Sequence, residues 1–437
     1  MKKLLAGAAI IDITPRKPMF LHGYPHVERD SEGINDPLYA SALIIDDGEN
    51  QIGFCAVDVI FVSKEITKEI RERVEKSIDI KGENLMVSAS HTHSGPVTVA
   101  DAFYDPIVPE PDPEYISYLI SKITQVFIEA YHDKRRSKIA ITSADSTGVG
   151  GNRHDKLGPV DSEVPVIVVR DFDQGHIFAL SIIHCMHPTV LHEDSKLISA
   201  DFPGYTRKFI SDNLGEDVVL LYQTGPSGNQ SPRHFIDSNS LSEARRLGFL
   251  LGKRITENIL RLNERDYQEW LSLKVQKTFL DLPRKRFMSL EDAKEKVAIV
   301  KTKLDLMRLY EKQETEIRTV ECDWFGAEEN LKLTKMSING GLEKVYETIL
   351  PIEISSVALG DVHFIFLPGE LFVEYSLKIK SILPGNVYVS TLSNGVLAGY
   401  IVTQEAEKKG VYEAFNSIFS WESGELIVET VHKMLQN

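Results

Sequence analysis

The chain has 437 residues, and its 49 Lys and Arg against 64 Asp and Glu give a formal net charge of −15. So acidic a surface repels a polyanion overall, which excludes nucleic acid as the expected partner. Hydrophobic residues make up 42% of the chain and charged residues 26%, so the disordered, collagen-like and coiled-coil classes are excluded as well. The length allows one large domain or roughly two to three smaller ones.

The apolar run Leu4–Ile11 follows Met1-Lys2-Lys3 and so imitates the start of a secretory signal. It lacks a small-residue cleavage site, however, and continues directly into Asp12-Ile13-Thr14-Pro15. We therefore expect a buried first strand, and no apolar stretch reaches the roughly 20 residues that span a bilayer. The chain has three widely spaced cysteines, Cys55, Cys185 and Cys322. Reduced thiols and a cytoplasmic protein without an integral membrane segment are expected.

Strands and helices then alternate along the chain. Tyr39–Asp46 and Gln51–Phe61 predict two strands, and the polar turn 46–50 predicts that they form a hairpin. Ser63 is placed to cap the helix that follows, and Leu85–Val87 predicts a buried strand that ends in polar residues. Further helices are expected at 113–130, 242–262 and 371–381 and from about 424, and further strands at 138–143, 164–170, 176–183, 218–222, 347–359, 363–367 and 387–391.

Residues from about 283 to 335 differ from the rest of the chain because Lys and Glu dominate them. Ser289 is placed to cap a long helix, and Glu291 and Asp292 fall in its first turn, where acidic side chains suit the helix dipole. This pattern predicts a solvated helical insertion on the outside of the protein. Neither a repeat nor a linker rich in Pro, Gly and Ser marks a domain boundary.

The strongest local signal for chemistry is His91-Thr92-His93, which follows the strand expected at Leu85–Val87. In an extended segment the two imidazoles project to one side about 6.6 Å apart, since each residue rises by roughly 3.3 Å. One ring can then bind a metal while the other faces a substrate. Taken alone, the triplet fits two loop histidines hydrogen-bonded to the backbone equally well.

A second histidine cluster, His184–His192, also follows an apolar strand and concentrates three histidines in a short segment. Neutral imidazoles are good zinc ligands, and three protein ligands with a water make a catalytic centre. His187 is the better ligand candidate because Pro188 favours extended backbone before it. The simpler interpretation of His184 is a core histidine on the preceding strand.

Seven segments in order extend these signals along most of the chain. They are Ala6-Gly7 with Asp12–Pro15 and His22–Tyr24, Ser90–Pro96, Asn152-Arg153, His187–Thr189 with Ala200–Tyr205, Gln223–Pro232, Pro368–Glu370, and Tyr400–Thr403 with Tyr412-Glu413. Together they resemble the catalytic domain of the neutral/alkaline non-lysosomal ceramidase family. Their shared order is far more specific than any one of the motifs.

The resemblance implies a zinc ion and a set of residues around a substrate amide. The implied zinc ligands are His91, His187, Glu370 and Tyr400, and the implied catalytic residues are His93, Arg153, Ser231 and Tyr412. Two imidazoles, a carboxylate and a phenolic oxygen form a ligand set suited to zinc. The implied activity is that of a zinc-dependent amidohydrolase, in which zinc-bound water attacks an N-acyl amide bond of a small-molecule substrate. His93 would move protons, and the other three catalytic residues would steady the oxyanion or contact the substrate.

Each of the less obvious residues also has a simpler interpretation. Glu370 would suit the start of the helix at 371–381, and Tyr400 would suit an ordinary strand. Arg153 would suit a surface ion pair, and Ser231 before Pro232 would suit a turn. A serine nucleophile needs a base and an orienting group, so zinc-bound water is the preferred nucleophile.

Two departures from the family pattern bear on the substrate. The serine loop has Gly228–Ser231 where the family commonly has an acidic-hydrophobic version, and no C-terminal β-sandwich domain is expected after Tyr412. Anionic lipid headgroups would repel the acidic surface, so a smaller soluble N-acyl compound is favoured over a ceramide-like lipid. A zinc hydrolase of esters, lactones or acylated sugars and a non-catalytic small-molecule binder stay open as alternatives.

The expected fold is α/β, or α+β, in one large domain of residues 1–437 with mixed sheets and surrounding helices. Site residues spread from 91 to 412 require the chain to fold as a single unit, with the site on loops at strand ends. A doubly wound parallel sheet is disfavoured, because hairpins are expected early and no Gly-rich phosphate loop follows a strand.

Overall fold

The larger sheet is mixed and has eight strands among the residues that this computed structural model describes, namely 3–24, 27–102, 107–310, 312 and 314–436. In spatial order they are β11 (Val219–Thr224), β9 (Ile177–His184), β8 (Glu163–Asp171), β6 (Arg135–Asp145), β1 (Leu5–Asp12), β3 (Tyr39–Asp46), β4 (Gln51–Val57) and β5 (Leu85–Ala89). The pairs β9–β11 and β4–β5 are parallel, and the other neighbours are antiparallel. The predicted hairpin is confirmed, since β3 and β4 pair across the turn that follows Asp46.

A smaller sheet stacks on one face of the larger one. Its strands are, in order, β13 (Leu273–Leu280), β14 (Ile352–Leu359), β15 (Val362–Phe366) and β17 (Val387–Ser390). Alternate residues divide between the two faces: Leu43 and Ile45 pack in the core shared with the smaller sheet, whereas Ala42 and Ile44 pack against helices. A strand that is buried on both faces consists of a continuous apolar run, which explains why β3 does not alternate between polar and apolar residues.

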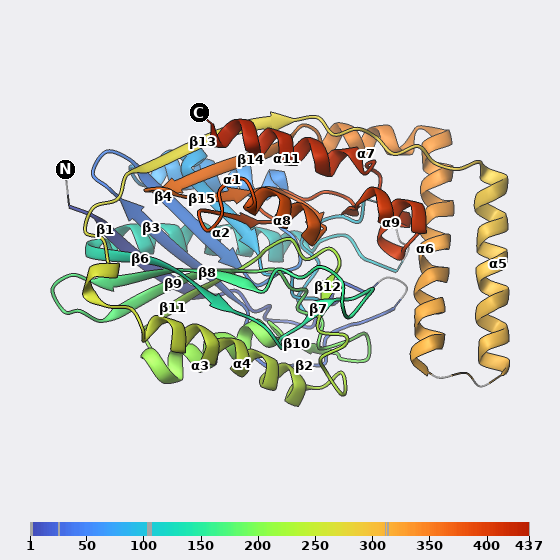
Figure 1. Ribbon diagram of the computed structural model, residues 1–437, viewed down its shortest axis with the longest axis horizontal. Coiled ribbons are helices and arrows are strands. Elements are labelled where there is room, and N and C mark those ends of the chain that lie inside the picture. The colour runs from blue at the N-terminus through green and yellow to red at the C-terminus, as the bar shows by residue number, and fades with distance from the viewer. Residues whose placement is uncertain (1–2, 25–26, 103–106, 311, 313, 437) are drawn as a thin grey trace.

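Helices cover the two outer faces, so the protein has four layers (Figure 1). The outer face of the larger sheet packs against α1 (Lys64–Ser77), α2 (Pro113–His132), α3 (Phe202–Leu214) and α4 (Leu241–Ile259). The outer face of the smaller sheet packs against α7 (Gly341–Ile349), α8 (Val373–Lys380) and α11 (Glu422–Leu435). Ser63 caps α1 as predicted, because its side chain accepts a hydrogen bond from the backbone N–H of Ile66 at 3.2 Å.

Short elements complete the fold at one end of the sheets. They are the strand pairs β2 (Gly33–Ile34) with β10 (Leu197–Ile198), β7 (Gly151–Asn152) with β12 (Gln230–Ser231) and β16 (Glu370–Leu371) with β18 (Tyr400–Ile401), and the helices α9 (Gln404–Lys409) and α10 (Tyr412–Phe415). Two single 3-10 turns lie elsewhere, at Gly82–Asn84 and Glu264–Asp266.

Two long helices, α5 (Leu290–Leu309) and α6 (Glu314–Asn339), form a hairpin that projects from the body of the protein (Figure 1). Ser289 caps α5 as predicted, accepting from the N–H of Asp292 at 3.1 Å. The hairpin has a small core of its own around Leu304 and Ala327. That this segment is an insertion remains a prediction.

Two expectations for the C-terminal half were incomplete. The strand expected at 347–359 begins at Ile352, because Leu342, Val345 and Tyr346 are spaced to bury one face of a helix, α7. Pro351 favours extended backbone at Leu350 and so ends that helix. Strand β13 was not expected, since polar side chains interrupt its apolar pattern at the sheet edge. Across the described part of the chain, no helix combines the length and apolar character needed to cross a bilayer.

Candidate metal centre and active site

Strands from both sheets end at the same place, and their following loops build the candidate site. The N–H of Gly225, after β11, donates to the carbonyl of His184 at the end of β9 at 2.9 Å. The N–H of Thr391, after β17, donates to Thr224 at 2.8 Å, and the N–H of Ala89 in β5 donates to Leu392 at 3.1 Å. Segments far apart in sequence are therefore fixed to one another by backbone hydrogen bonds.

His91 lies two residues beyond β5 and is only 1% exposed. Its backbone has φ of +68°, a left-handed conformation that a non-glycine residue adopts at an energetic cost. The N–H donates to Val59 at 3.0 Å, and ring Nδ1 lies 3.0 Å from the carbonyl of Ile60. With Nδ1 held there, Nε2 faces Oε2 of Glu370, which lies 3.4 Å away.

His187, after β9, is anchored in the same way. Its Nδ1 lies 2.7 Å from the carbonyl oxygen of Ser227 and 3.1 Å from that of Gln230, both in the loop after β11. Its Nε2 lies 3.0 Å from Oε2 of Glu370. By contrast, His184 is a core histidine: its Nδ1 lies 2.8 Å from the Tyr222 hydroxyl, and burial lowers its pKa to about 3.

Glu370 and Tyr400 are neighbours because β16 and β18 pair in parallel, with Glu370 opposite Tyr400. Glu370 Oε2 also lies 3.4 Å from Nε2 of His91, so one carboxylate oxygen touches both anchored histidines. The helix α8 begins at Val373 with Phe372 as its cap, so the simpler interpretation of Glu370 as a residue of that helix is wrong. Burial, followed by the charge of Glu370, raises the pKa of Tyr400.

The contacts of His91 and His187 indicate which nitrogen of each ring carries a hydrogen. A backbone carbonyl only accepts, so Nδ1 of both His91 and His187 carries a hydrogen. In its neutral form, such a ring presents a lone pair at Nε2. Burial lowers the pKa of His187 to about 4, which keeps that ring neutral at neutral pH. Burial alone would raise the pKa of Glu370, but the positive charge and the hydrogen bonds that His91 and His187 offer when protonated outweigh burial and hold that pKa well below its ordinary value. Two imidazole nitrogens and a carboxylate that face one another form a ligand set that could hold a cation, and imidazole with carboxylate suits zinc.

His93 completes a group of three histidines whose ligand atoms all lie within 4.8 Å of one another. Its Nε2 is 3.3 Å from Nε2 of His91. Unlike the other two rings, its Nδ1 has no hydrogen-bond partner within the described segments, so no backbone carbonyl fixes its tautomer. Burial, then the other histidines, lowers the pKa of His93 well below its ordinary value. His93 is therefore a neutral imidazole that can accept a proton.

A buried arginine that the sequence did not single out holds the His93 loop. Arg29 is 0% exposed and donates from Nη1 to the His93 carbonyl at 2.9 Å. Its Nε and Nη2 both donate to the Ser195 carbonyl, at 3.1 and 2.9 Å, in the loop after His187. Its guanidinium also lies 4.9 Å from the centre of the Tyr24 ring, which in turn packs 5.3 Å from the His93 ring.

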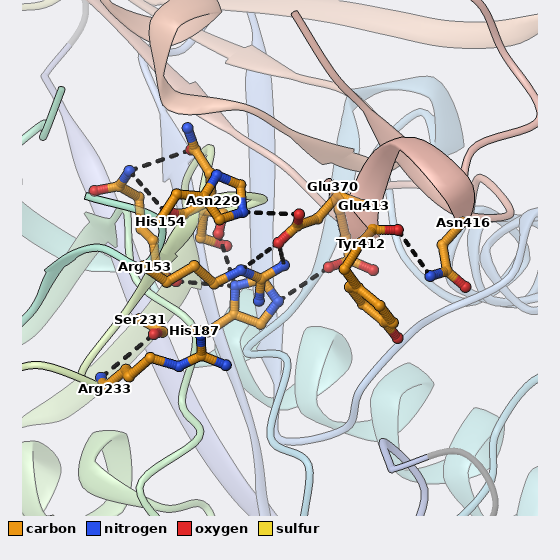
Figure 2. Close-up of polar contacts among 12 residues, drawn as sticks. Arg153, His154, His187, Asn229, Ser231, Arg233, Glu370, Tyr412, Glu413 and Asn416 are labelled. Carbon is orange, nitrogen blue, oxygen red and sulfur yellow. Dashed lines mark hydrogen bonds and ion pairs between the residues drawn. The ribbon is translucent and has the colours of Figure 1, made fainter. Parts of the chain in front are cut away.

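Arg153 lies in a buried ion-pair network beside the histidines (Figure 2). Its Nε donates to Oε1 of Glu413 at 2.6 Å, and Oε2 of the same carboxylate lies 2.8 Å from Nε2 of His154. Glu413 is 1% exposed. Burial acts to raise the pKa of Glu413, but Arg153 and His154 outweigh it and bring that pKa down to about 2. The interpretation of Arg153 as part of a surface ion pair is therefore wrong.

Tyr412 and Ser231 lie on opposite sides of this network (Figure 2). Tyr412 opens α10, its ring is 6.4 Å from that of Tyr400, and burial raises its pKa, so it stays protonated and can donate. Ser231 lies in β12 opposite Gly151 of β7, and its hydroxyl accepts from the N–H of Arg233 at 3.3 Å. That contact is what a turn residue makes, so the simpler interpretation of Ser231 stays open.

The structure thus brings the implied residues into one region. His91, His187, Glu370 and His93 form its centre, and Tyr400, Arg153 and Tyr412 surround it. The roles assigned to them remain predictions. The sequence missed Glu413 as the partner of Arg153, although it lies next to Tyr412 in a segment already singled out, and it gave no signal for Arg29.

Three comparisons place this geometry among known proteins. The family described as neutral/alkaline non-lysosomal ceramidase, N-terminal, matches residues 4–225 of the chain. "Neutral ceramidase 3" of Arabidopsis thaliana is 26% identical over 167 residues, which cover 34% of this chain. The chain spans only 21% of the length of that curated relative.

Solved structures are similar over the whole chain. The crystal structure of neutral ceramidase from Pseudomonas aeruginosa gives a TM-score of 0.77 at 17% sequence identity, covering 100% of this chain and 74% of that one. A ceramidase complexed with C2 gives a TM-score of 0.76 at 16% identity, covering 100% of this chain and 75% of that one. The likeness establishes a shared fold, and the predicted α/β architecture with mixed sheets is confirmed.

Proposed function

Because the chain belongs to the neutral/alkaline non-lysosomal ceramidase family, we propose that it is a zinc-dependent amidohydrolase that cleaves an N-acyl amide bond. One observation carries the proposal. Nε2 of His91 and Nε2 of His187 both face Oε2 of Glu370, at 3.4 and 3.0 Å, while both Nδ1 atoms are committed to backbone carbonyls. Metal-binding histidines usually donate their other nitrogen in this way, which fixes the tautomer that leaves a lone pair for the metal.

The proposed zinc ligands are His91, His187, Glu370 and Tyr400. When bound there, zinc would supply Lewis-acid chemistry, lowering the pKa of water and polarising a carbonyl oxygen. The third imidazole, His93, is assigned to proton transfer because its Nδ1 is not anchored and its Nε2 lies 3.3 Å from Nε2 of His91. A neutral ring with a free nitrogen would take a proton from the attacking water and return it to the leaving amine nitrogen.

Three further residues of the chain would act on the substrate. The Tyr412 hydroxyl, protonated because burial raises its pKa, would donate a hydrogen bond to the oxygen that gains negative charge. Arg153, held by Glu413, would add a fixed positive charge near that oxygen. The Ser231 hydroxyl would contact the substrate beside them. The substrate is a ceramide-like lipid or a smaller soluble N-acyl compound.

Metal content and a paired substrate screen test this proposal. Protein purified without chelators is analysed for zinc and assayed on N-acylsphingosine, short N-acyl amines and the matching esters. We expect bound zinc and amide hydrolysis that chelation removes and added zinc restores. The absence of both bound zinc and zinc-restored activity would overturn the proposal, and hydrolysis of the esters alone would favour the ester-hydrolase alternative.

Single substitutions test which residues bind the metal. His91→Ala is expected to lose zinc and turnover together, while Ser231→Ala retains zinc and loses activity. His132→Ala, at the exposed end of α2, is the matched control and should change neither. Retention of zinc and turnover by His91→Ala would show that the ligand assignment is wrong.

A further inference from the structure

Positively charged side chains gather on the loops beside the candidate site, in a protein whose net charge is −15. The N–H of Arg153 donates to the Asn229 carbonyl at 2.9 Å, and β7 pairs with β12, so the segments 153–156 and 232–234 are held together. The His234 ring forms a hydrogen bond with the backbone of Arg153. Burial, followed by the charges of Lys156 and Arg233, lowers the pKa of His234. Asp155 lies within range of the same ring and opposes them.

Arg233 is the cation of this group that stands next to the implied substrate contact. Its N–H donates to the hydroxyl of Ser231 at 3.3 Å. Figure 2 shows its side chain extending from that turn in the direction of His187 and the guanidinium of Arg153. Ser231 itself joins the loop whose carbonyls anchor His187. The guanidinium is thus carried by the loop that supports the metal centre.

Arg153 and Arg233 differ in whether they have an ion-pair partner in the protein. Arg153 already pairs with the buried carboxylate of Glu413. Arg233 is exposed, and no carboxylate among the described residues forms an ion pair with it. A planar guanidinium presents two parallel N–H donors that match both oxygens of one carboxylate. An uncharged lipid amide would leave that donor pair unused.

We propose that Arg233 binds a carboxylate on the amine half of the substrate, so that this enzyme hydrolyses N-acyl amino acids. The inference rests on the proposed amidohydrolase function. Arg233 lies on the same turn as Ser231, the implied contact to the amide, and an N-acyl α-amino acid carries its carboxylate one carbon from the amide nitrogen. In the reaction one water adds its oxygen to the acyl carbon, the C–N bond breaks, and the nitrogen takes a proton, giving a fatty or short-chain acid and a free amino acid.

A matched substrate pair isolates the carboxylate. N-octanoylglycine and N-octanoylethanolamine share the acyl chain and the scissile amide, and differ in a carboxylate against a hydroxymethyl group. We expect wild-type protein to show a kcat/KM for N-octanoylglycine that is roughly 3- to 10-fold higher, since an ion pair with an exposed arginine contributes about 1 kcal/mol. Rising ionic strength should reduce this ratio, because the arginine is exposed and salt screens it.

Arg233→Gln tests the residue. We expect the ratio to collapse towards unity, mainly through KM for N-octanoylglycine, and Arg233→Glu to reverse it. Arg261→Gln removes an exposed arginine just beyond α4 and should preserve the wild-type ratio. A wild-type ratio near unity, or one that Arg233→Gln leaves intact, would overturn the inference while amide hydrolysis itself still supports the proposed function.

A third substrate tests on which half the carboxylate lies. An N-alkyl succinamate carries the carboxylate on the acyl half, and its preferential hydrolysis would contradict the assignment to the amine half. If the zinc-loaded protein hydrolyses none of these amides, the proposed function fails. That outcome is distinct from the loss of a preference between two amides that are both turned over.

Discussion

The candidate metal centre and the Arg153–Glu413 network lie side by side but are held by different means. Backbone carbonyls at strand ends fix the rings of His91 and His187, so the sheets themselves set the positions of the ligand atoms. Arg153 is held by the side chain of Glu413, 260 residues away in sequence, on the short helix α10. Where the backbone holds the site, loss of one ligand side chain should leave the fold and its stability nearly unchanged. Where a side-chain ion pair holds the network, loss of the carboxylate should lower the stability of the protein.

The same substitution made in both regions tests that difference, and its largest effect is expected at the metal centre. Glu370→Gln removes the carboxylate that touches both anchored histidines. Activity should fall on the order of 1000-fold or more, with zinc affinity lowered by more than the roughly 10- to 100-fold loss typical of an outer-shell partner. The melting temperature of the metal-free protein should stay near the wild-type value. Equilibrium dialysis with zinc and thermal unfolding measure the two quantities, and a variant that binds zinc normally would contradict the assignment.

Glu413→Gln should lower the stability of the protein and leave its zinc content unchanged, the reverse of the result expected for Glu370→Gln. Without the carboxylate, Arg153 remains as a largely buried charge with no counter-ion, and breaking such a pair costs about 3–5 kcal/mol of stability. Zinc content should be unchanged, and kcat should fall by roughly 100-fold because the guanidinium loses its fixed position. Glu405→Gln, in an exposed ion pair with Lys409, is the matched control and should alter neither quantity. If Glu413→Gln loses zinc, the two regions are not separate.

The stability that Glu413 contributes should depend on pH. Its pKa is about 2 in the folded protein against an ordinary value of 4.5. A carboxyl whose folded pKa is lowered stabilises the protein above its unfolded pKa, and this contribution disappears as the pH falls through the folded pKa. The stability difference between wild type and Glu413→Gln should therefore shrink by roughly 3 kcal/mol between about pH 5 and pH 2. Denaturant titrations over this range measure it, and a constant difference would refute the assigned ion pair.

The smallest expected effect lies in the contact between the α5–α6 hairpin and α10. A Cβ on Gly326 of α6 would lie 3.3 Å from the Phe415 ring and 3.4 Å from Cα of Tyr412. Gly326→Ala should therefore shift α10 slightly and reduce kcat by about 2- to 5-fold, with zinc content unchanged. Ser337→Ala, an exposed position of α6, serves as control. Unchanged kcat in Gly326→Ala would show that the hairpin does not position α10.

Local signals in the sequence predicted the elements well, since caps and turns act over a few residues. Ser63 and Ser289 cap their helices, and the two histidine segments lie at strand ends as expected. Glu370 and Tyr400 could be connected only through the family resemblance, because the pairing of β16 with β18 joins residues 30 positions apart without a hydrophobic pattern. The role of Arg29 could not be predicted, because nothing local distinguishes a buried arginine from an exposed one.

The central claim is that zinc lies between the strand-end loops of the two sheets. Anomalous diffraction at the zinc edge, from crystals of protein purified without chelators, tests it directly. The account predicts one strong peak at about 2.0–2.2 Å from Nε2 of His91, Nε2 of His187 and a carboxylate oxygen of Glu370. A zinc-soaked crystal with no peak at these three atoms would contradict it.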